Sequence, residues 1–111
     1  MATDLIDLCK DFSSTPGGRY RLEGVFSGEE FREDFVEPKL NAGHDVVIDI
    51  DGVEGLSSSF LEEVFGGLIR KFGARVVSRV EVRAATKPFR ARKVKEFVER
   101  AIADLGSKPD K

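Results

Sequence analysis

Three consecutive hydroxyl groups, on Ser57, Ser58 and Ser59, have the type and spacing to take part in chemistry. Apolar side chains follow them at helical spacing, so we predict a helix that begins at Ser59, with Glu62 in the capping-box position. The free N–H groups and the dipole of a helix N-terminus favour an anion. A phosphoryl group on Ser58 or Ser59 would be stabilised there and would add a charge of about −1.5 to −2 to the surface. The simpler alternative is that Ser59 is an N-cap and its neighbours are loop residues.

Two carboxylates, Asp49 and Asp51, form a second candidate site. They lie two residues apart in a predicted strand, so both point to the same face and could act together on a metal or a proton. The sequence offers no third ligand beside them, and its single cysteine, Cys9, and single histidine, His44, cannot complete a zinc site. We therefore expect strand-end capping by these aspartates, with no metal, no cofactor and no catalytic residue.

A basic cluster near the C-terminus is the third candidate. Residues 1–66 have a net charge of −10 and residues 67–111 a net charge of +8, counted from Asp, Glu, Lys and Arg. The residues that could contact phosphates of a nucleic acid are Lys87, Arg90, Arg92, Lys93 and Lys95. The alternative is that they form the solvated face of the last helix.

These candidates need elements to position them, and the pattern predicts the order β-β-α-β-α-β-α. Four strands are predicted from segments in which apolar residues alternate with polar ones or form a continuous run; they cover residues 4–12, 20–26, 45–51 and 75–84. Helices are predicted from Ser27, as N-cap, to about Leu40, over residues 59–72, and from Pro88 to about Leu105. The first two strands would form a hairpin, and Pro38 would kink or end the first helix. The fold class is thus a small α/β domain whose mixed four-stranded sheet is covered by helices.

Length and composition agree with a single domain over residues 1–111 that has a flexible tail at residues 106–111. The chain has 111 residues, of which 41% are hydrophobic and 34% charged, the profile of a soluble globular domain. No apolar run approaches the roughly 18 residues of a membrane helix, and the first residues do not form a secretory signal. With one cysteine, a reduced, cytoplasmic compartment is expected.

The segment VVIDIDGVEGLSSSFLEEVFGGLIR resembles the core of STAS domains, the fold of anti-sigma-factor antagonists. The residues that match the STAS motif are Asp49, Val53, Ser58, Ser59 and Leu61. Ser57 stands where the motif has aspartate, and Phe60 stands where it has glycine. We expect the bulk of Phe60 to crowd the approach of a kinase to the hydroxyls.

A closer resemblance is to the uncharacterised bacterial domains called STAS-like. It is carried by the strings GGRY, SGEEFRE and SSSFLEEVFGGL, over residues 17–73. The resemblance implies a STAS-like α/β fold and occurrence beside ATPase domains of the histidine-kinase type.

The resemblance and the hydroxyls together predict a non-enzymatic signalling or regulatory module that binds a protein partner, with an ATPase of the histidine-kinase type as the implied class. The expected interface is the loop and helix start at 53–63, switched by serine phosphorylation at Ser58 or Ser59. Its expected residues are Val53, Glu54, Ser57, Ser58, Ser59, Phe60, Glu62 and Glu63. The alternative is a nucleic-acid-binding accessory protein that uses the basic cluster, and a small hydrolase ranks below both.

Overall fold

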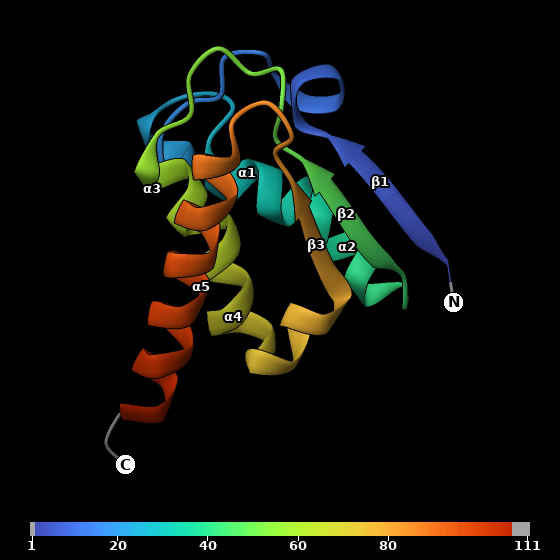
Figure 1. Cartoon of the computed structure of the whole chain (residues 1–111), viewed down its shortest axis with the longest axis vertical. Coiled ribbons are helices and arrows are strands. Elements are labelled where there is room, and N and C mark those ends of the chain that lie inside the picture. Colours follow the sequence, from blue (N-terminus) through green and yellow to red (C-terminus); the bar gives the residue numbers. More distant parts are fainter. Residues whose placement is uncertain (1, 108–111) are drawn as a thin grey trace.

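Three parallel strands form the sheet of this protein, for which a computed structural model describes residues 2–107 (Figure 1). The strands are β1 (Thr3–Asp7), β2 (Asp45–Asp49) and β3 (Val80–Arg83), and they lie in the order β1-β2-β3. Ile6, Ile48 and Val82 share one row across the sheet. The α/β class is confirmed, whereas the predicted mixed, four-stranded sheet is wrong.

Two long helices connect the strands, and each contains one wide turn. In the first, which we call the α1–α2 helix, a wide turn separates α1 from α2; its three parts are Gly28–Phe31, Arg32–Val36 and Glu37–Asn41. In the second, the α3–α4 helix, the parts are Ser58–Leu61, Glu62–Gly66 and Gly67–Phe72. After β3 the chain ends its described part in α5 (Pro88–Ser107).

Of the two effects predicted for Pro38, a kink or the end of the first helix, the second is wrong. Proline lacks an N–H, and its ring clashes with the carbonyl four residues earlier in a regular helix. The wide turn Arg32–Val36 opens the backbone just before Pro38, and the helix continues to Asn41. The N-cap of this helix is Ser27, as predicted, since its Oγ accepts from the N–H of Glu30 at 3.0 Å.

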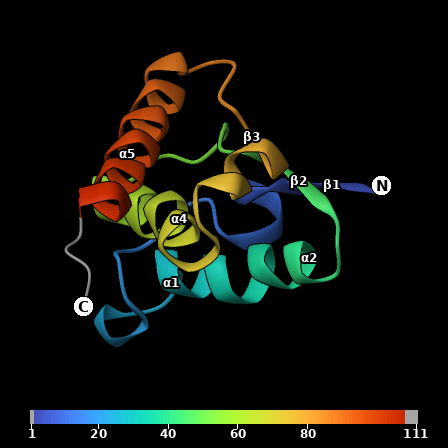
Figure 2. The same cartoon turned by 90° about the horizontal axis from the view of Figure 1, so that it is seen from below.

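The hydrophobic core lies on one face of the sheet. Ile6 and Ile48 on that face are at most 2% exposed and pack with the apolar stripes of the three helices in one cluster. On the opposite face, Leu5 is 60% exposed and Glu81 is also exposed. Figure 2 shows α1, α2 and α4 on one side of the strands and α5 beyond β3.

The second predicted strand, over residues 20–26, is not a strand. Part of it forms a short 3₁₀ turn, Arg21–Glu23, and Gly24 follows with a φ of 140°. The carboxylate of Glu23 accepts from the backbone N–H groups of Arg19 and Tyr20, at 3.0 and 2.9 Å. These local hydrogen bonds turn the chain back on itself and replace the pairing that a hairpin would need.

The other three strands are all shorter than predicted, and β2 ends at Asp49, two residues before its predicted end. β1 ends at Asp7, whose side chain accepts from the N–H of Lys10, and one wide helical turn (Leu8–Phe12) follows. Before β3, residues Ala74–Arg79 form a 3₁₀ turn where the prediction had a strand from residue 75. α5 includes Gly106 and Ser107, which the prediction gave to the tail, and residues 108–111 lie outside the described part of the chain.

The loops that follow the three strands gather at the upper end of the molecule in Figure 1. Because all three strands are parallel, their carboxyl ends lie at the same end of the sheet, where α/β proteins usually place their binding residues. The predicted hydroxyl site lies in the loop after β2, at this edge. Within residues 2–107, no helix has the length and hydropathy to cross a membrane.

Candidate functional site

Ser57 caps the α3–α4 helix, two residues earlier than the predicted cap, Ser59. Its Oγ accepts from the N–H of Phe60 at 3.1 Å, and the helix begins at Ser58. The same hydroxyl donates to the carbonyl of Gly17 at 3.4 Å. Ser59 is thus the second residue of the helix, and the prediction that it is the N-cap is wrong.

Ser58 and Ser59 are exposed on the first turn of this helix. Within residues 2–107, neither hydroxyl has a hydrogen bond of its own. Both are therefore accessible to a partner or to a modifying enzyme, next to the unpaired N–H groups of a helix N-terminus.

Only part of the predicted 53–63 interface lies at the surface. Val53 and Phe60 are 2% and 1% exposed, and Glu63 is 5% exposed. Glu54 is exposed beside the three serines, and Glu62 is partly exposed. Val53, Phe60 and Glu63 therefore belong to the interior and cannot contact a partner.

Phe60 does not crowd the serines, contrary to the expectation from its size. Its ring lies 6.0 Å from that of Phe31 and 6.2 Å from that of Phe12, between centroids, within the core. The position where the STAS motif has glycine is therefore occupied here by a residue that anchors the helix start to the α1–α2 helix. The backbone permits this contact because a Cβ on Gly28 would lie only 2.8 Å from the carbonyl oxygen of Phe60.

An exposed apolar segment lies beside this helix start, and the sequence analysis missed it. Leu22 is 98% exposed, Val25 75%, Tyr20 47% and Phe26 39%. A strand prediction assigned these side chains to a sheet. The signal against a strand was Gly24 between Leu22 and Val25, since a glycine inside a predicted strand often marks a break.

The segment is held in place by polar contacts at its base. The guanidinium of Arg21 pairs with Asp34 and Glu33 on the α1–α2 helix, at 2.8 and 3.2 Å. The N–H of Gly17 donates to the carbonyl of Phe26 at 2.8 Å. Phe26 has a φ of 58°, a conformation that few non-glycine residues adopt. The exposed side chains are therefore presented on a defined backbone.

Contacts at the base of the apolar segment join it to the helix start that carries the serines, and we treat the two as one surface. Ser57 contacts Gly17, which pairs with Phe26, and Arg19 pairs with Glu62 one turn after the serines. We call this the loop surface. Its members are Tyr20, Leu22, Val25, Phe26, Glu54, Ser57, Ser58 and Ser59.

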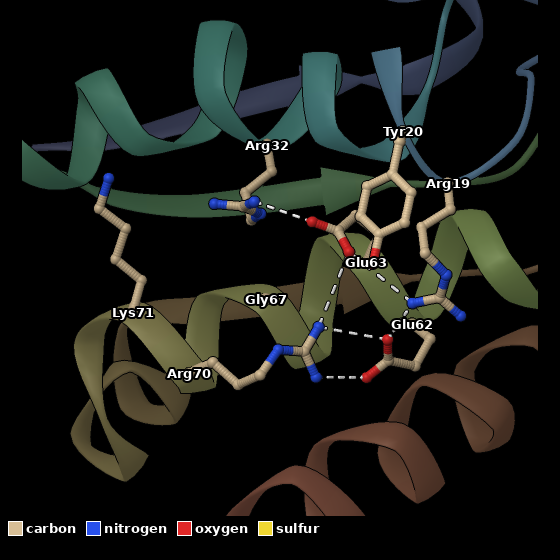
Figure 3. A pocket seen from close by; sticks show the side chains of 8 residues that line it. All are labelled: Arg19, Tyr20, Arg32, Glu62, Glu63, Gly67, Arg70 and Lys71. Atoms are coloured by element: carbon tan, nitrogen blue, oxygen red, sulfur yellow. Dashed lines mark hydrogen bonds and ion pairs between the residues drawn. The ribbon is translucent and has the colours of Figure 1, made fainter. Parts of the chain in front are cut away.

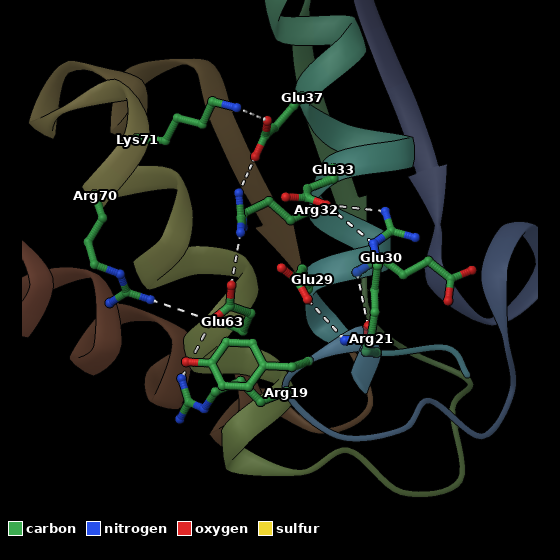
Figure 4. A network of polar contacts seen from close by, with 12 residues as sticks. Arg19, Arg21, Glu29, Glu30, Arg32, Glu33, Glu37, Glu63, Arg70 and Lys71 are labelled. Carbon is green, nitrogen blue, oxygen red and sulfur yellow. Dashed lines mark hydrogen bonds and ion pairs between the residues drawn. The ribbon is translucent and has the colours of Figure 1, made fainter. Parts of the chain in front are cut away.

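A network of ion pairs joins the two long helices below the loop surface (Figure 4). At its centre, Arg32, which is 9% exposed, pairs with Glu37 and with Glu63, the latter at 2.9 Å. Lys71 also pairs with Glu37, at 2.7 Å. Each buried carboxylate is thus shared by more than one cation, which offsets the cost of burying it.

A pocket of about 560 Å³ opens over this network (Figure 3). Arg19 and Tyr20 point toward Glu62 and Glu63 in its wall. Arg70 donates two hydrogen bonds to Glu62, at 2.7 and 3.2 Å, and Arg19 donates another. Burial raises the pKa of Glu62, but the hydrogen bonds from Arg70 and Arg19 outweigh it and hold that pKa below its ordinary value. The Glu62 carboxylate is thus favoured in its ionised form and paired with two arginines, so it is a poor general base.

The two aspartates after β2 have separate structural roles. Asp49 accepts from the N–H of Asp51 at 2.9 Å, which closes the turn after the strand. Asp51 accepts from both the N–H and the hydroxyl of Thr86, each at 3.0 Å, which fixes the loop before α5. Within the described residues, no group of three acids, histidines or cysteines could hold a metal ion.

One member of the basic cluster is buried. Arg90 is 7% exposed and donates to the carbonyl of Val53 at 3.2 Å. It fixes the loop after β2 onto α5 and is not available to a phosphate. The exposed members are Lys87, Arg92, Lys93 and Lys95.

The family comparison agrees with the resemblance. A family model described as "STAS-like domain of unknown function (DUF4325)" matches residues 27–89, more than half of the chain. The matched region contains the strings SGEEFRE and SSSFLEEVFGGL, and GGRY precedes it. No curated protein and no solved structure gives a significant match.

Proposed function

This chain belongs to the family of STAS-like domains of unknown function, and we propose that it is a non-enzymatic regulatory module that binds a protein partner through the loop surface. The proposal keeps the helix start at Ser57–Ser59 as part of the interface. It replaces the buried residues Val53, Phe60 and Glu63 with the exposed apolar segment.

The observation that carries the proposal is the exposure of Leu22 and Val25. Water covers nearly the whole Leu22 side chain, although a buried leucine would stabilise the fold by about 2 kcal/mol. Small monomeric domains expose few contiguous apolar side chains, and those that do so usually bind another molecule there. Tyr20 and Phe26 add aromatic area, which is enriched at the centre of protein interfaces.

The class of partner follows from the resemblance to STAS domains. It implies an ATPase of the histidine-kinase type, and a regulatory interaction inside the cytoplasm. Within this proposal, the exposed hydroxyls of Ser58 and Ser59 are the phosphoacceptors. A phosphoryl group there would add charge to an interface that otherwise packs against neutral serines, and desolvating that charge would weaken binding.

A nucleic-acid-binding role is the alternative, and the burial of Arg90 weakens it. Four exposed cations would remain, and Phe89, 56% exposed, is the one aromatic residue within the stretch 87–95 that carries them. A stacking surface needs more aromatic rings than this.

Site-specific photocrosslinking tests the proposal. A benzoylphenylalanine at position 22 should capture one protein in cells, and the same group at Glu99, exposed on α5, should not. A partner captured equally from both positions, or from neither, would remove the loop surface as the interface.

A further inference from the structure

An apolar groove of about 220 Å³ runs between β3 and α5, on a part of the molecule that shares no residue with the loop surface. Its floor is the α3–α4 helix, through Phe65, Leu68 and Ile69. The walls come from β3, the turn before it and α5; these residues are Val76, Val77, Val80, Val82, Ala91, Val94, Lys95 and Val98. Val77 is 46% exposed, so the groove opens to solvent at that end.

The wall formed by β3 is a free sheet edge. Within residues 2–107, β3 pairs only with β2, and Figure 1 shows its other side turned toward α5. The carbonyl of Arg83 accepts from the N–H of Ile50 on the β2 side. Because backbone groups alternate along a strand, the N–H and carbonyl of Val82 point to the free edge, beside the groove. An extended chain can pair with such an edge.

The one charged residue that lines the groove is basic. It is Lys95, which is exposed on α5 one turn after Arg92. Neither of these two cations forms an ion pair with an acid in residues 2–107, and no acid lines the groove. An occupant that carries acidic side chains would therefore gain charge complementarity as well as apolar burial.

We propose that the groove receives an extended, acidic segment of a partner protein. The segment adds a fourth strand beside β3, directs alternate apolar side chains into the groove, and directs acidic side chains toward Arg92 and Lys95. This proposal does not depend on the loop surface, because the two surfaces use different residues.

A nucleic acid fits this groove less well. Ten of its eleven lining residues are apolar, but the one aromatic ring among them, Phe65, is 3% exposed and cannot stack on a base. Apolar side chains in alternation, as in a strand, match these walls.

Selection from a library of short random peptides displayed on phage provides the probe. The proposal predicts an enriched class that alternates valine or isoleucine with aspartate or glutamate. In a ¹⁵N-labelled sample, a synthetic peptide of this class should shift the amide resonances of Val80, Val82, Val94 and Val98. No enriched class, or resonance shifts confined to another surface, would overturn the proposal.

A matched pair of charge reversals on α5 tests the rim. Lys95→Glu should weaken binding of the selected peptide by at least about tenfold, whereas Lys93→Glu, exposed on another flank of the helix, should change it by less than about twofold. Equal effects of the two variants would contradict the proposal. Oligothymidylate is the second probe, and competition of this oligonucleotide with the peptide would assign the surface to nucleic acid. A dimer in sedimentation that blocks the peptide would assign it to a second copy of the chain.

Discussion

The guanidinium of Arg32 lies so close to Gly67 that a Cβ on this glycine would come within 2.5 Å of Arg32 Nε. Because Gly67 has no side chain, the α3–α4 helix can lie close to Arg32 of the α1–α2 helix. The guanidinium of Arg32 pairs there with Glu37 and Glu63. The ion pairs and the close approach depend on each other. This contact fixes the angle at which the helix that carries Ser57–Ser59 crosses its neighbour.

Gly67→Ala should therefore destabilise the protein by about 2–4 kcal/mol, although alanine improves helix propensity by about 1 kcal/mol. The methyl group would displace a buried guanidinium from its two carboxylates. Gly66→Ala is the matched control, because its Cβ meets the end of the Glu62 side chain, which is partly exposed and can rotate away. We expect its free energy of unfolding to stay within about 1 kcal/mol of wild type in a urea titration. Equal losses in both variants would contradict the role given to Arg32.

Ser57→Ala should cost about 1 kcal/mol, since it removes the hydrogen bond to the N–H of Phe60. Ser59→Ala should leave the free energy of unfolding unchanged or raise it slightly, because alanine is favoured inside a helix and no cap is lost. Thermal unfolding of the two variants distinguishes these positions. If Ser59→Ala were the more destabilised, the helix would begin two residues later than in this structure.

Phe60→Ala should destabilise the protein by about 3–5 kcal/mol, because it empties the centre of a cluster of phenylalanine rings. Phe89→Ala is the control for the same substitution at a ring that is 56% exposed, and it should cost less than about 1 kcal/mol. Similar melting temperatures for the two variants would show that Phe60 does not anchor the helix start.

Acid should weaken the contribution that Glu62 makes to the free energy of unfolding. Its pKa lies below the ordinary value of 4.5, because hydrogen bonds from Arg70 and Arg19 outweigh the effect of burial. A carboxylate with a lowered pKa stabilises the fold fully above its ordinary pKa, and this stabilisation is lost as the pH falls through the lower, folded value. The difference in unfolding free energy between wild type and Glu62→Gln should therefore narrow as the pH falls below about 4.5. A difference that stays constant would contradict the pairing.

Part of this fold followed from local patterns. The period of the apolar residues predicted the three helices, and the Ser27 cap was found because its hydroxyl precedes a clear stripe. The helix start at Ser57 was misplaced by two residues, since three adjacent serines are equivalent caps until the tertiary structure brings Gly17 beside Ser57 and Phe31 beside Phe60.

The rest depended on contacts distant in the sequence. The strand predicted over residues 20–26 was replaced by a loop because Glu23 satisfies nearby N–H groups and Arg21 pairs with the following helix. The burial of Glu63 could not be predicted from its type, since it requires Arg32, 31 residues away. The predicted site therefore differs most from the observed one at charged residues that form ion pairs between helices.

The central claim is tested most directly by titrating the partner protein, once identified by photocrosslinking, against the wild-type chain and against the Leu22→Asp variant. Leu22 is 98% exposed, so the variant should keep the wild-type melting temperature while its affinity falls by at least about tenfold. Ser58→Asp should weaken binding too, since an aspartate suits a helix N-terminus but places an unpaired charge at the interface. The control is Lys93→Glu, at a residue that belongs to neither the loop surface nor the groove. Wild-type affinity in a well-folded Leu22→Asp variant would contradict the account.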